Sequence, residues 1–396
     1  MLVYQPKAWA HLLPVRDHLV RDGHTVVLVS PREATDRPLE AAGLPFIKAH
    51  ERLPSPRFAM NLLRSLHRMK IDESDAMLRP LVATGGPLRK MLAWRALYYS
   101  TVYAGLARKA AVLEELDGVI GTDSGSVAGR FFFRSALTSG KPAVLLQHGL
   151  FAANAGVREY FVGQRIFVWG STSFEQLERH VSSASAFVEI LGSPLLEQRL
   201  TETTSAAESD GRTIVAVAFG VPGGFMSVGA FMAAAREVLL AAGRLSDFGF
   251  VIKPHPGDST TIWHDLIEET GVTNVTVVRN RDIYSLLRTS QALITMVSTT
   301  GAEASCLGLP VFSVDFSGAN RSADFVQSGA AYVVEREGEL ADRLRSVLTS
   351  PGRDELFAVR AAFAGRFLHR EDESASKRVA RRLVELTQSA GQVSLR

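Results

Sequence analysis

Cysteine is almost absent from this chain: Cys306 is the one cysteine among 396 residues. A single cysteine excludes a disulfide framework and any metal site built from several cysteines. The sequence also lacks a cluster of histidine and acidic residues at metal-ligand spacing, and it has no Gly-x-Ser-x-Gly motif that would carry a catalytic serine. We therefore expect no metal ion and no cofactor, and a serine hydrolase is not indicated.

Apolar segments that could cross a membrane are equally scarce. No basic stretch followed by an apolar core marks a secretory signal near Met1. The segment 213–235 has no charged residue over 23 positions, which is enough to span a bilayer. Pro222 and four glycines interrupt it, so we interpret it as a strand, a glycine loop and the start of a helix. These features predict a cytoplasmic protein.

Net charge is small, with 44 basic and 41 acidic residues and a balance of +3, but it is unevenly spread. Between Arg57 and Lys109 there are ten Lys or Arg against three Asp or Glu. Such a segment could hold anionic lipid, nucleic acid or a phosphorylated substrate, or it could form solvated helix faces. We expect no nucleic-acid partner; peripheral contact of residues 57–109 with the inner face of a membrane is an alternative.

The order of apolar and polar segments indicates an α/β protein. Hydrophobic residues make up 46% of the chain and charged residues 21%, as in ordinary globular proteins. Short apolar runs alternate with helical stretches, which favours parallel sheets flanked by helices. The expected strands are 2–4, 25–29, 46–48, 118–121, 143–146, 166–169 and 187–191 in the first half, and 213–219, 249–253, 275–278, 292–295, 311–314 and 332–334 in the second.

A polar stretch over 201–212 separates the two halves and has almost nothing to bury, so we interpret it as a linker. We expect a Rossmann-like domain over 1–200, a second over 213–372, and a final helix over 373–396 that packs back on the first domain. Ligands of open parallel sheets bind beyond the carboxyl ends of the strands. Two doubly wound domains would therefore face each other across a cleft.

The most informative motif, Lys-Pro-His-Pro-Gly-Asp, begins at Lys253, directly after an expected strand. Its two prolines fix the backbone, so the turn presents Lys253 and His255 at the strand end. A lysine supplies a point charge and a histidine a directional donor, a combination that suits a phosphate group.

A second motif, Ser-Thr-Thr-Gly-Ala-Glu, occupies 298–303 after another expected strand. Ser298, Thr299 and Thr300 at a helix start, with Glu303 in its first turn, predict a capping box. Hydroxyls and free amides at a helix start can also bind a phosphate, and Glu303 could instead bind a ribose.

A glycine loop that contains Gly220 and Gly223 follows the first strand of the second half. Glycines let a ligand approach the backbone closely. The loop has neither the Gly-Lys-Ser/Thr of a phosphate-binding loop nor the three-glycine spacing of a dinucleotide fold. We expect it to contribute to the same binding site.

In the first half, Gln147 and His148 precede a glycine at a strand end, where the histidine could serve as a general base. Asp123 follows the strand 118–121 and is a second candidate base; Asp123 or Ser124 should cap the next helix. His11 lies near the same edge in the loop after the first strand. We expect His11 and Gln147 on the acceptor side of the cleft.

These motifs, taken in order, resemble the glycosyltransferase-B fold. The helix that ends in Arg-Asp-Gly-His-Thr-Val at 21–26 resembles the start of such enzymes. Gln-His-Gly at 147–149, Lys-Pro-His-Pro at 253–256, Ser-Thr-Thr-Gly-Ala-Glu-Ala at 298–304 and Gly-Leu-Pro-Val at 308–311 resemble a narrower group. That group comprises bacterial surface-polysaccharide transferases of the capsule, sialyl and Kdo types and the teichoic-acid glycerophosphotransferases, and UDP-N-acetylglucosamine 2-epimerases are similar in architecture.

The resemblance implies that Lys253, His255, Ser298 and Thr299 hold the phosphate of an activated donor. It also implies an acidic catalytic base, for which Thr-Asp-Ser-Gly at 122–125 is a partial counterpart. We predict a glycosyltransferase that moves a sugar from a nucleotide-sugar substrate to a hydroxyl acceptor, with Asp123 or His148 as base and His255 at the leaving phosphate. The alternatives are a 2-epimerase or glycerophosphotransferase on the same fold, and a non-catalytic membrane-associated binding protein.

Overall fold

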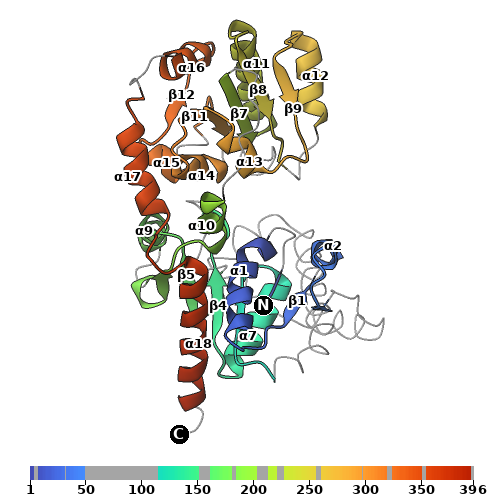
Figure 1. Ribbon diagram of the computed structural model, residues 1–396, viewed down its shortest axis with the longest axis vertical. Helices are drawn as coiled ribbons and strands as arrows, with labels where there is room; N and C mark the ends of the chain where they lie inside the picture. The colour runs from blue at the N-terminus through green and yellow to red at the C-terminus, as the bar shows by residue number, and fades with distance from the viewer. Residues whose placement is uncertain are drawn as a thin grey trace, which may run out of the picture.

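Two parallel β-sheets, one in each half of the chain, form the framework of the computed structural model (Figure 1). The structure describes residues 1–3, 8–31, 33–49, 115–150, 161–180, 184–202, 213–220, 227–255, 260–296, 298–318, 323–349 and 354–393. The basic segment 57–109 therefore lies outside the described residues.

The N-terminal sheet is parallel throughout. Leu2 bridges Val29 on one side and Gly121 on the other, so it joins a two-stranded and a four-stranded part into the order β2-β1-Leu2-β3-β4-β5-β6. The strands are β1 (Leu28–Ser30), β2 (Phe46–Lys48), β3 (Val119–Gly121), β4 (Ala143–Leu146), β5 (Arg165–Val168) and β6 (Val188–Ile190).

Helices cover this sheet and bury its apolar side chains. Phe131, Phe132 and Phe133 on one helix pack with Leu2 and Val29 in a common core, which removes their large apolar surfaces from water. The helical segments are α1 (Ala8–Arg21), α2 (Glu33–Ala41), α7 (Val127–Thr138), α9 (Ser171–His180), the short η1 (Ala184–Ala186) and α10 (Pro194–Thr201).

The C-terminal sheet has the order β12-β11-β10-β7-β8-β9, again all parallel. Its central strand β10 is buried at every position, which explains its mainly apolar sequence; the hydroxyl of Thr295 donates to the Ala218 carbonyl over 2.7 Å. The strands are β7 (Thr213–Phe219), β8 (Phe248–Ile252), β9 (Val275–Val277), β10 (Ala292–Met296), β11 (Val311–Val314) and β12 (Tyr332–Val334).

The uncharged segment 213–235 divides between β7 and the start of the next helix, as the sequence predicts. No helix in the described part of the chain has the length and apolar character that crossing a membrane requires. The helices of this half are α11 (Val228–Arg244), α12 (Thr261–Thr270), α13 (Ile283–Arg288), α14 (Thr300–Cys306), α15 (Asp324–Gln327), α16 (Leu340–Thr349), α17 (Phe357–Phe367) and α18 (Ala375–Val393).

Each sheet reverses its winding direction at one point. In the C-terminal sheet the chain runs outward from β7 through β8 and β9, then returns to the other side of β7 with β10. In the N-terminal sheet the same reversal lies between Leu2 and β3. Ligands of doubly wound folds bind beyond the carboxyl ends of the strands at such reversals. The topology thus marks one binding position in each half.

The chain crosses back to the N-terminal half before α18, which packs against α1 and α10 (Figure 1). A largely buried ion pair fastens this return: Arg378 Nη2 lies 3.0 Å from Glu197 Oε1, and the Ala375 amide donates to Glu197 Oε2 over 2.6 Å. The Trp169 ring meets Phe367 edge to face at 5.6 Å between centroids. Polar and apolar contacts therefore both join the halves at this side.

Several predicted boundaries are shifted. The expected strand 25–29 forms only at Leu28–Ser30, and the polar stretch predicted as a linker from 201 begins later, because Thr201 still belongs to α10. The Thr201 hydroxyl donates to the carbonyls of Glu197 and Gln198, which satisfies two end groups of the helix. Residues 203–212 are outside the described part.

Candidate functional site

The loop after β4 is held by the side chain of Gln147, which is 2% exposed. Its Nε2 donates to the Gly149 carbonyl over 3.0 Å and to Ser173 Oγ over 2.9 Å. Its Oε1 accepts from the Trp169 amide over 2.8 Å. All three hydrogen bonds are made to other groups of the protein, so the side chain of Gln147 stabilises the loop that carries His148.

His148 follows the carboxyl end of β4, and its side chain is exposed to solvent. The protein packed around the ring nevertheless disfavours the charged imidazolium, and this desolvation lowers the pKa of His148. The nearby Asp123 carboxylate and a hydrogen bond from the ring to the Thr122 carbonyl act in the opposite direction. A ring that donates through one nitrogen keeps the lone pair of the other nitrogen as an acceptor.

His11 is on α1, and its ring lies beside the ring of His148. Its ring stacks on Trp169 at 5.9 Å between centroids and meets His148 edge to face at 6.4 Å. Burial, and secondly the proximity of His148, lower the pKa of His11 to about 3. Its Nδ1 is buried without a hydrogen-bond partner among the residues that the structure describes. Both imidazoles are therefore neutral near pH 7.

Asp123 organises the turn before α7. Its Oδ1 accepts from the amides of Gly125 over 2.7 Å and Ser126 over 3.1 Å. The prediction that Asp123 or Ser124 caps the helix is wrong, because the N-cap is Ser126, whose Oγ accepts from Gly129. A Cβ on Gly129 would lie 2.4 Å from the Asp123 carbonyl oxygen, so the turn approaches the helix too closely for any other residue there.

In the C-terminal half, the residues predicted to bind phosphate lie at the ends of strands. Lys253 follows β8 and its amide donates to the Val217 carbonyl, which extends the sheet pairing by one residue. Lys253 is half-buried and His255 is exposed. The amide of Gly220, directly after β7, donates to the Met296 carbonyl at the end of β10. Gly223 lies outside the described residues.

Ser298 and Thr300 start α14 in an arrangement that differs from the predicted capping box. The N-cap is Thr299, whose backbone is already helical and whose side chain makes no capping bond within the described residues. Ser298 Oγ instead accepts from the Thr300 amide and donates to Thr300 Oγ1. Glu303 is bonded to Tyr284. The capping-box prediction is therefore wrong, because Ser298 satisfies the helix start and Glu303 has another partner.

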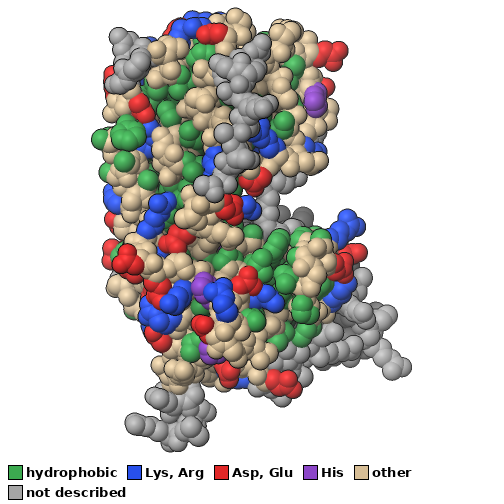
Figure 2. Space-filling model, in the orientation of Figure 1, with side chains coloured by type: hydrophobic (Ala, Val, Ile, Leu, Met, Phe, Trp, Pro, Cys, Tyr) green, Lys and Arg blue, Asp and Glu red, His purple; other side chains and the backbone are tan. Residues whose placement is uncertain are grey.

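The two halves meet at these loops. A Cβ built on Gly149 would lie 3.8 Å from Thr299 Oγ1, so the loop after β4 approaches the loop after β10. The space-filling view shows the molecule hollowed between the halves on its right side (Figure 2). His148 is the residue before Gly149, so it belongs to the loop that approaches Thr299 of the Ser-Thr-Thr segment.

Sequence reasoning missed Trp169 and Tyr284. Trp169 follows β5 directly, and its Nε1 donates to the Gln147 carbonyl over 2.9 Å while its ring supports His11. An aromatic residue at a strand's carboxyl end was the available signal. Tyr284 carries no motif, and only the three-dimensional structure brings it to Glu303.

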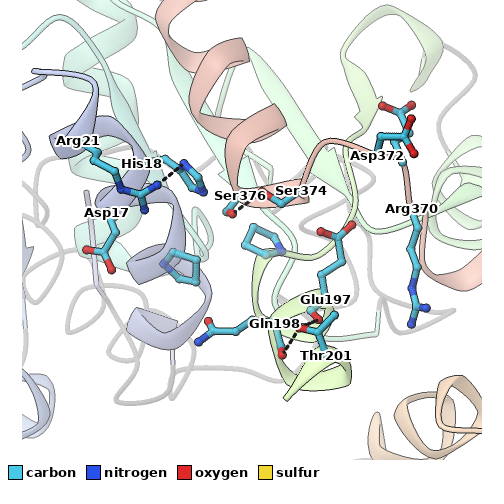
Figure 3. Close-up of a pocket in the computed structure, with 13 residues that line it drawn as sticks. Asp17, His18, Arg21, Glu197, Gln198, Thr201, Arg370, Asp372, Ser374 and Ser376 are labelled. Carbon is cyan, nitrogen blue, oxygen red and sulfur yellow. Dashed lines mark hydrogen bonds between the residues drawn. The ribbon is translucent and has the colours of Figure 1, made fainter. Parts of the chain in front are cut away.

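A separate pocket lies where the chain returns from the C-terminal half (Figure 3). Its volume is about 490 Å³, and its wall includes side chains of both charges. The figure shows Arg21, His18 and Asp17 of α1 on one side and Arg370 and Asp372 on the other. None of the predicted site residues lines it.

Comparison with known proteins defines the fold. No protein-family model and no curated protein matches the chain. Solved structures do match over nearly the whole length. A UDP-N-acetylglucosamine 2-epimerase from Neisseria meningitidis bound to UDP-GlcNAc is 12% identical, with a TM-score of 0.59 and 98% of each chain covered.

Two transferase structures match with somewhat lower TM-scores. The glycosyltransferase SnogD from Streptomyces nogalater is 17% identical, with a TM-score of 0.56 and 98% of each chain covered. MurG from Acinetobacter baumannii is 14% identical, with a TM-score of 0.53, and 97% of this chain and 99% of that chain are covered. The prediction of two Rossmann-like domains in the glycosyltransferase-B fold is confirmed.

Proposed function

We propose that this protein is an enzyme that acts on a nucleotide sugar and transfers the sugar to a hydroxyl acceptor. The observation that carries this proposal is the meeting of two unlike loops. One loop carries His148, an imidazole that is neutral near pH 7 and hydrogen-bonded to the Thr122 carbonyl. It approaches, through Gly149, the Ser298–Thr300 segment at the reversal point of the other sheet, where Thr299 Oγ1 is the nearest hydroxyl.

The N-terminal loop suits deprotonation of an acceptor. The free ring nitrogen of His148 takes the proton of the acceptor hydroxyl, whose oxygen forms a bond to the anomeric carbon of the sugar. Asp123 stabilises the imidazolium that results, since its charge favours the protonated ring. His11 stays neutral and holds the acceptor beside His148. Asp123 therefore acts through the histidine in this scheme.

The C-terminal loops suit the departing phosphate. As the bond between the anomeric carbon and the phosphate oxygen breaks, its electron pair stays on the nucleotide. Lys253, His255 and the hydroxyls after β10 are placed at strand ends to stabilise that added charge. Gly220 directly follows β7, beside the reversal point, where a nucleotide can approach the backbone, and we propose the same role for Gly223, which lies outside the described residues. Because protein groups supply this stabilisation, the proposal needs no metal ion.

The matched structures and the motif order support narrower assignments. Several neighbours carry UDP or a UDP-sugar in their descriptions, so UDP is the first nucleotide to test. The order of the motifs favours a bacterial surface polysaccharide as the acceptor. We propose that this protein acts on it in the cytoplasm, at the inner face of the membrane. We also propose that 1–200 and 213–372 act as acceptor and donor domains, joined by the linker 201–212 and by the helix within 373–396.

The test combines nucleotide binding with transfer. Thermal shift with UDP, CMP, CDP, GDP and dTDP should show stabilisation by one base in preference to the others. His255→Ala should abolish that shift and reduce transfer by at least ~100-fold while the fold is retained. His264→Ala, on the exposed face of α12, is the matched control and should leave both unchanged. Full turnover by His255→Ala would show that the phosphate assignment is wrong.

An epimerase is the second candidate, because 2-epimerases are among the most similar structures. An epimerase inverts a sugar carbon without any acceptor. Incubation with UDP-GlcNAc alone, followed by NMR, separates the two functions: a new epimer supports the epimerase, whereas an unchanged donor that is consumed only when acceptor is added supports the transferase.

A further inference from the structure

Helix α10 is wedged between the two halves of the molecule (Figure 1). It packs against α1 and α18 of the N-terminal side. Its Leu196 and Leu200 belong to the same apolar cluster as Tyr284 and Ala302 of the C-terminal half. Helix α10 therefore contacts side chains of both halves at once.

Arg199 extends this contact from α10 to a single aromatic ring. Its guanidinium lies 5.7 Å from the centroid of the Tyr284 ring, within the range of a cation–π contact. Its Nη1 also pairs with Glu202 Oε2 at 3.0 Å, which fixes the side chain on α10. Tyr284 is only 6% exposed, so its ring has little freedom under the guanidinium.

The hydroxyl of Tyr284 is bonded to the carboxylate of Glu303. Burial, and then the charge of Glu303, raise the pKa of Tyr284 well above its ordinary value, so the phenol stays protonated and donates. Glu303 lies one helical turn after Thr299, on the same face of α14. That face is the one that approaches the Gly149 loop.

We propose that Tyr284 is a positioning residue for the nucleotide donor: its hydroxyl orients Glu303 to accept hydrogen bonds from the ribose hydroxyls, and Arg199 holds the Tyr284 ring in place. A carboxylate has several acceptor positions, so one bond from tyrosine is compatible with others from a ribose. The inference rests on the proposed function and deepens it, since binding of the donor then depends on how α10 packs against Tyr284.

The test compares a nucleotide with its 2′-deoxy analogue. The screen above identifies the base, and the matched pair (UDP and 2′-deoxy-UDP, or the CDP, CMP or GDP equivalents) is then measured by calorimetry. The unaltered protein should bind the ribonucleotide ~10-fold more tightly. Tyr284→Phe keeps the ring and removes the hydroxyl, so it should weaken ribonucleotide binding ~5–10-fold and leave the deoxynucleotide unchanged. Added to Glu303→Gln, it should have no further effect.

Tyr332→Phe is the matched control, because Tyr332 also donates to a carboxylate, Asp354 Oδ1 at 3.0 Å, elsewhere in the same half. It should change stability without changing the ribose preference. Equal weakening of both nucleotides by Tyr284→Phe, or an unaltered preference, would overturn the positioning role while leaving the proposed function intact. A protein that binds dTDP best would also overturn it. A protein that binds none of the nucleotides would overturn the proposed function itself.

Discussion

The two halves share a doubly wound parallel sheet, yet the loops at the ends of their strands differ in electrostatics. In the N-terminal half, packing lowers the pKa of both His11 and His148, so positive charge is suppressed. In the C-terminal half, Lys253 is half-buried and His255 is exposed to solvent. The N-terminal half thus carries two neutral imidazoles, which are suited to moving a proton, and the C-terminal half carries a lysine and a histidine, which are suited to holding an anion.

Substituting His148 should break the comparison most severely. His148→Gln keeps a hydrogen-bonding group but cannot accept a proton, so we expect kcat to fall by ~10²–10⁴-fold with the melting temperature retained. Steady-state kinetics with donor and acceptor both varied measures this. His255→Gln is the counterpart in the other half and should raise the donor KM as well as lower kcat, because His255 both binds the donor phosphate and stabilises the charge that develops on it. Identical kinetic patterns for the two variants would contradict the division of roles.

The next effect concerns stability. Gln147→Leu leaves the Trp169 amide and the Ser173 hydroxyl without their buried partner. We expect the free energy of unfolding to fall by ~2–4 kcal/mol, since each unsatisfied buried group costs ~1–3 kcal/mol. Ser298→Ala in the C-terminal loop after β10 should cost only ~1 kcal/mol, because Ser298 is half-buried and water can replace it. Urea denaturation measures both, and equal losses would show that the loops are braced alike.

The smallest effect is a pH dependence. His11 has a pKa of about 3 in the folded protein and about 6.5 when unfolded. Below pH 6.5 the unfolded chain therefore binds the extra proton, and stability falls as the pH falls. One such group removes at most ~1.4 kcal/mol per pH unit.

Melting curves between pH 7 and pH 5 check this slope. His11→Phe keeps a ring on Trp169 but cannot titrate, so its stability should fall less steeply than that of the unaltered protein. Parallel slopes for the two proteins would mean that His11 is protonated as readily in the folded state as in the unfolded one.

Local signals predicted most of the framework. The central strands β7 and β10 are mainly apolar runs, and the sequence places both within one residue. The prediction of a strand over 25–29 was shifted because the segment is short and its pairing depends on Leu2, which is distant along the chain. The capping box at Thr299 was wrong because a sequence pattern cannot show that Glu303 has a buried tyrosine as its partner.

The amino-acid sequence by itself determined the alternation of strands and helices, the two halves and the chemistry-bearing residues after the strands, because apolar periodicity and turn residues act over a few neighbours. Tertiary structure alone decided that His11 stacks on Trp169, that both imidazoles are desolvated and that Arg199 of one half covers Tyr284 of the other. Those properties depend on which distant segments exclude water from a side chain, and pairwise burial of this kind has no signature in local sequence.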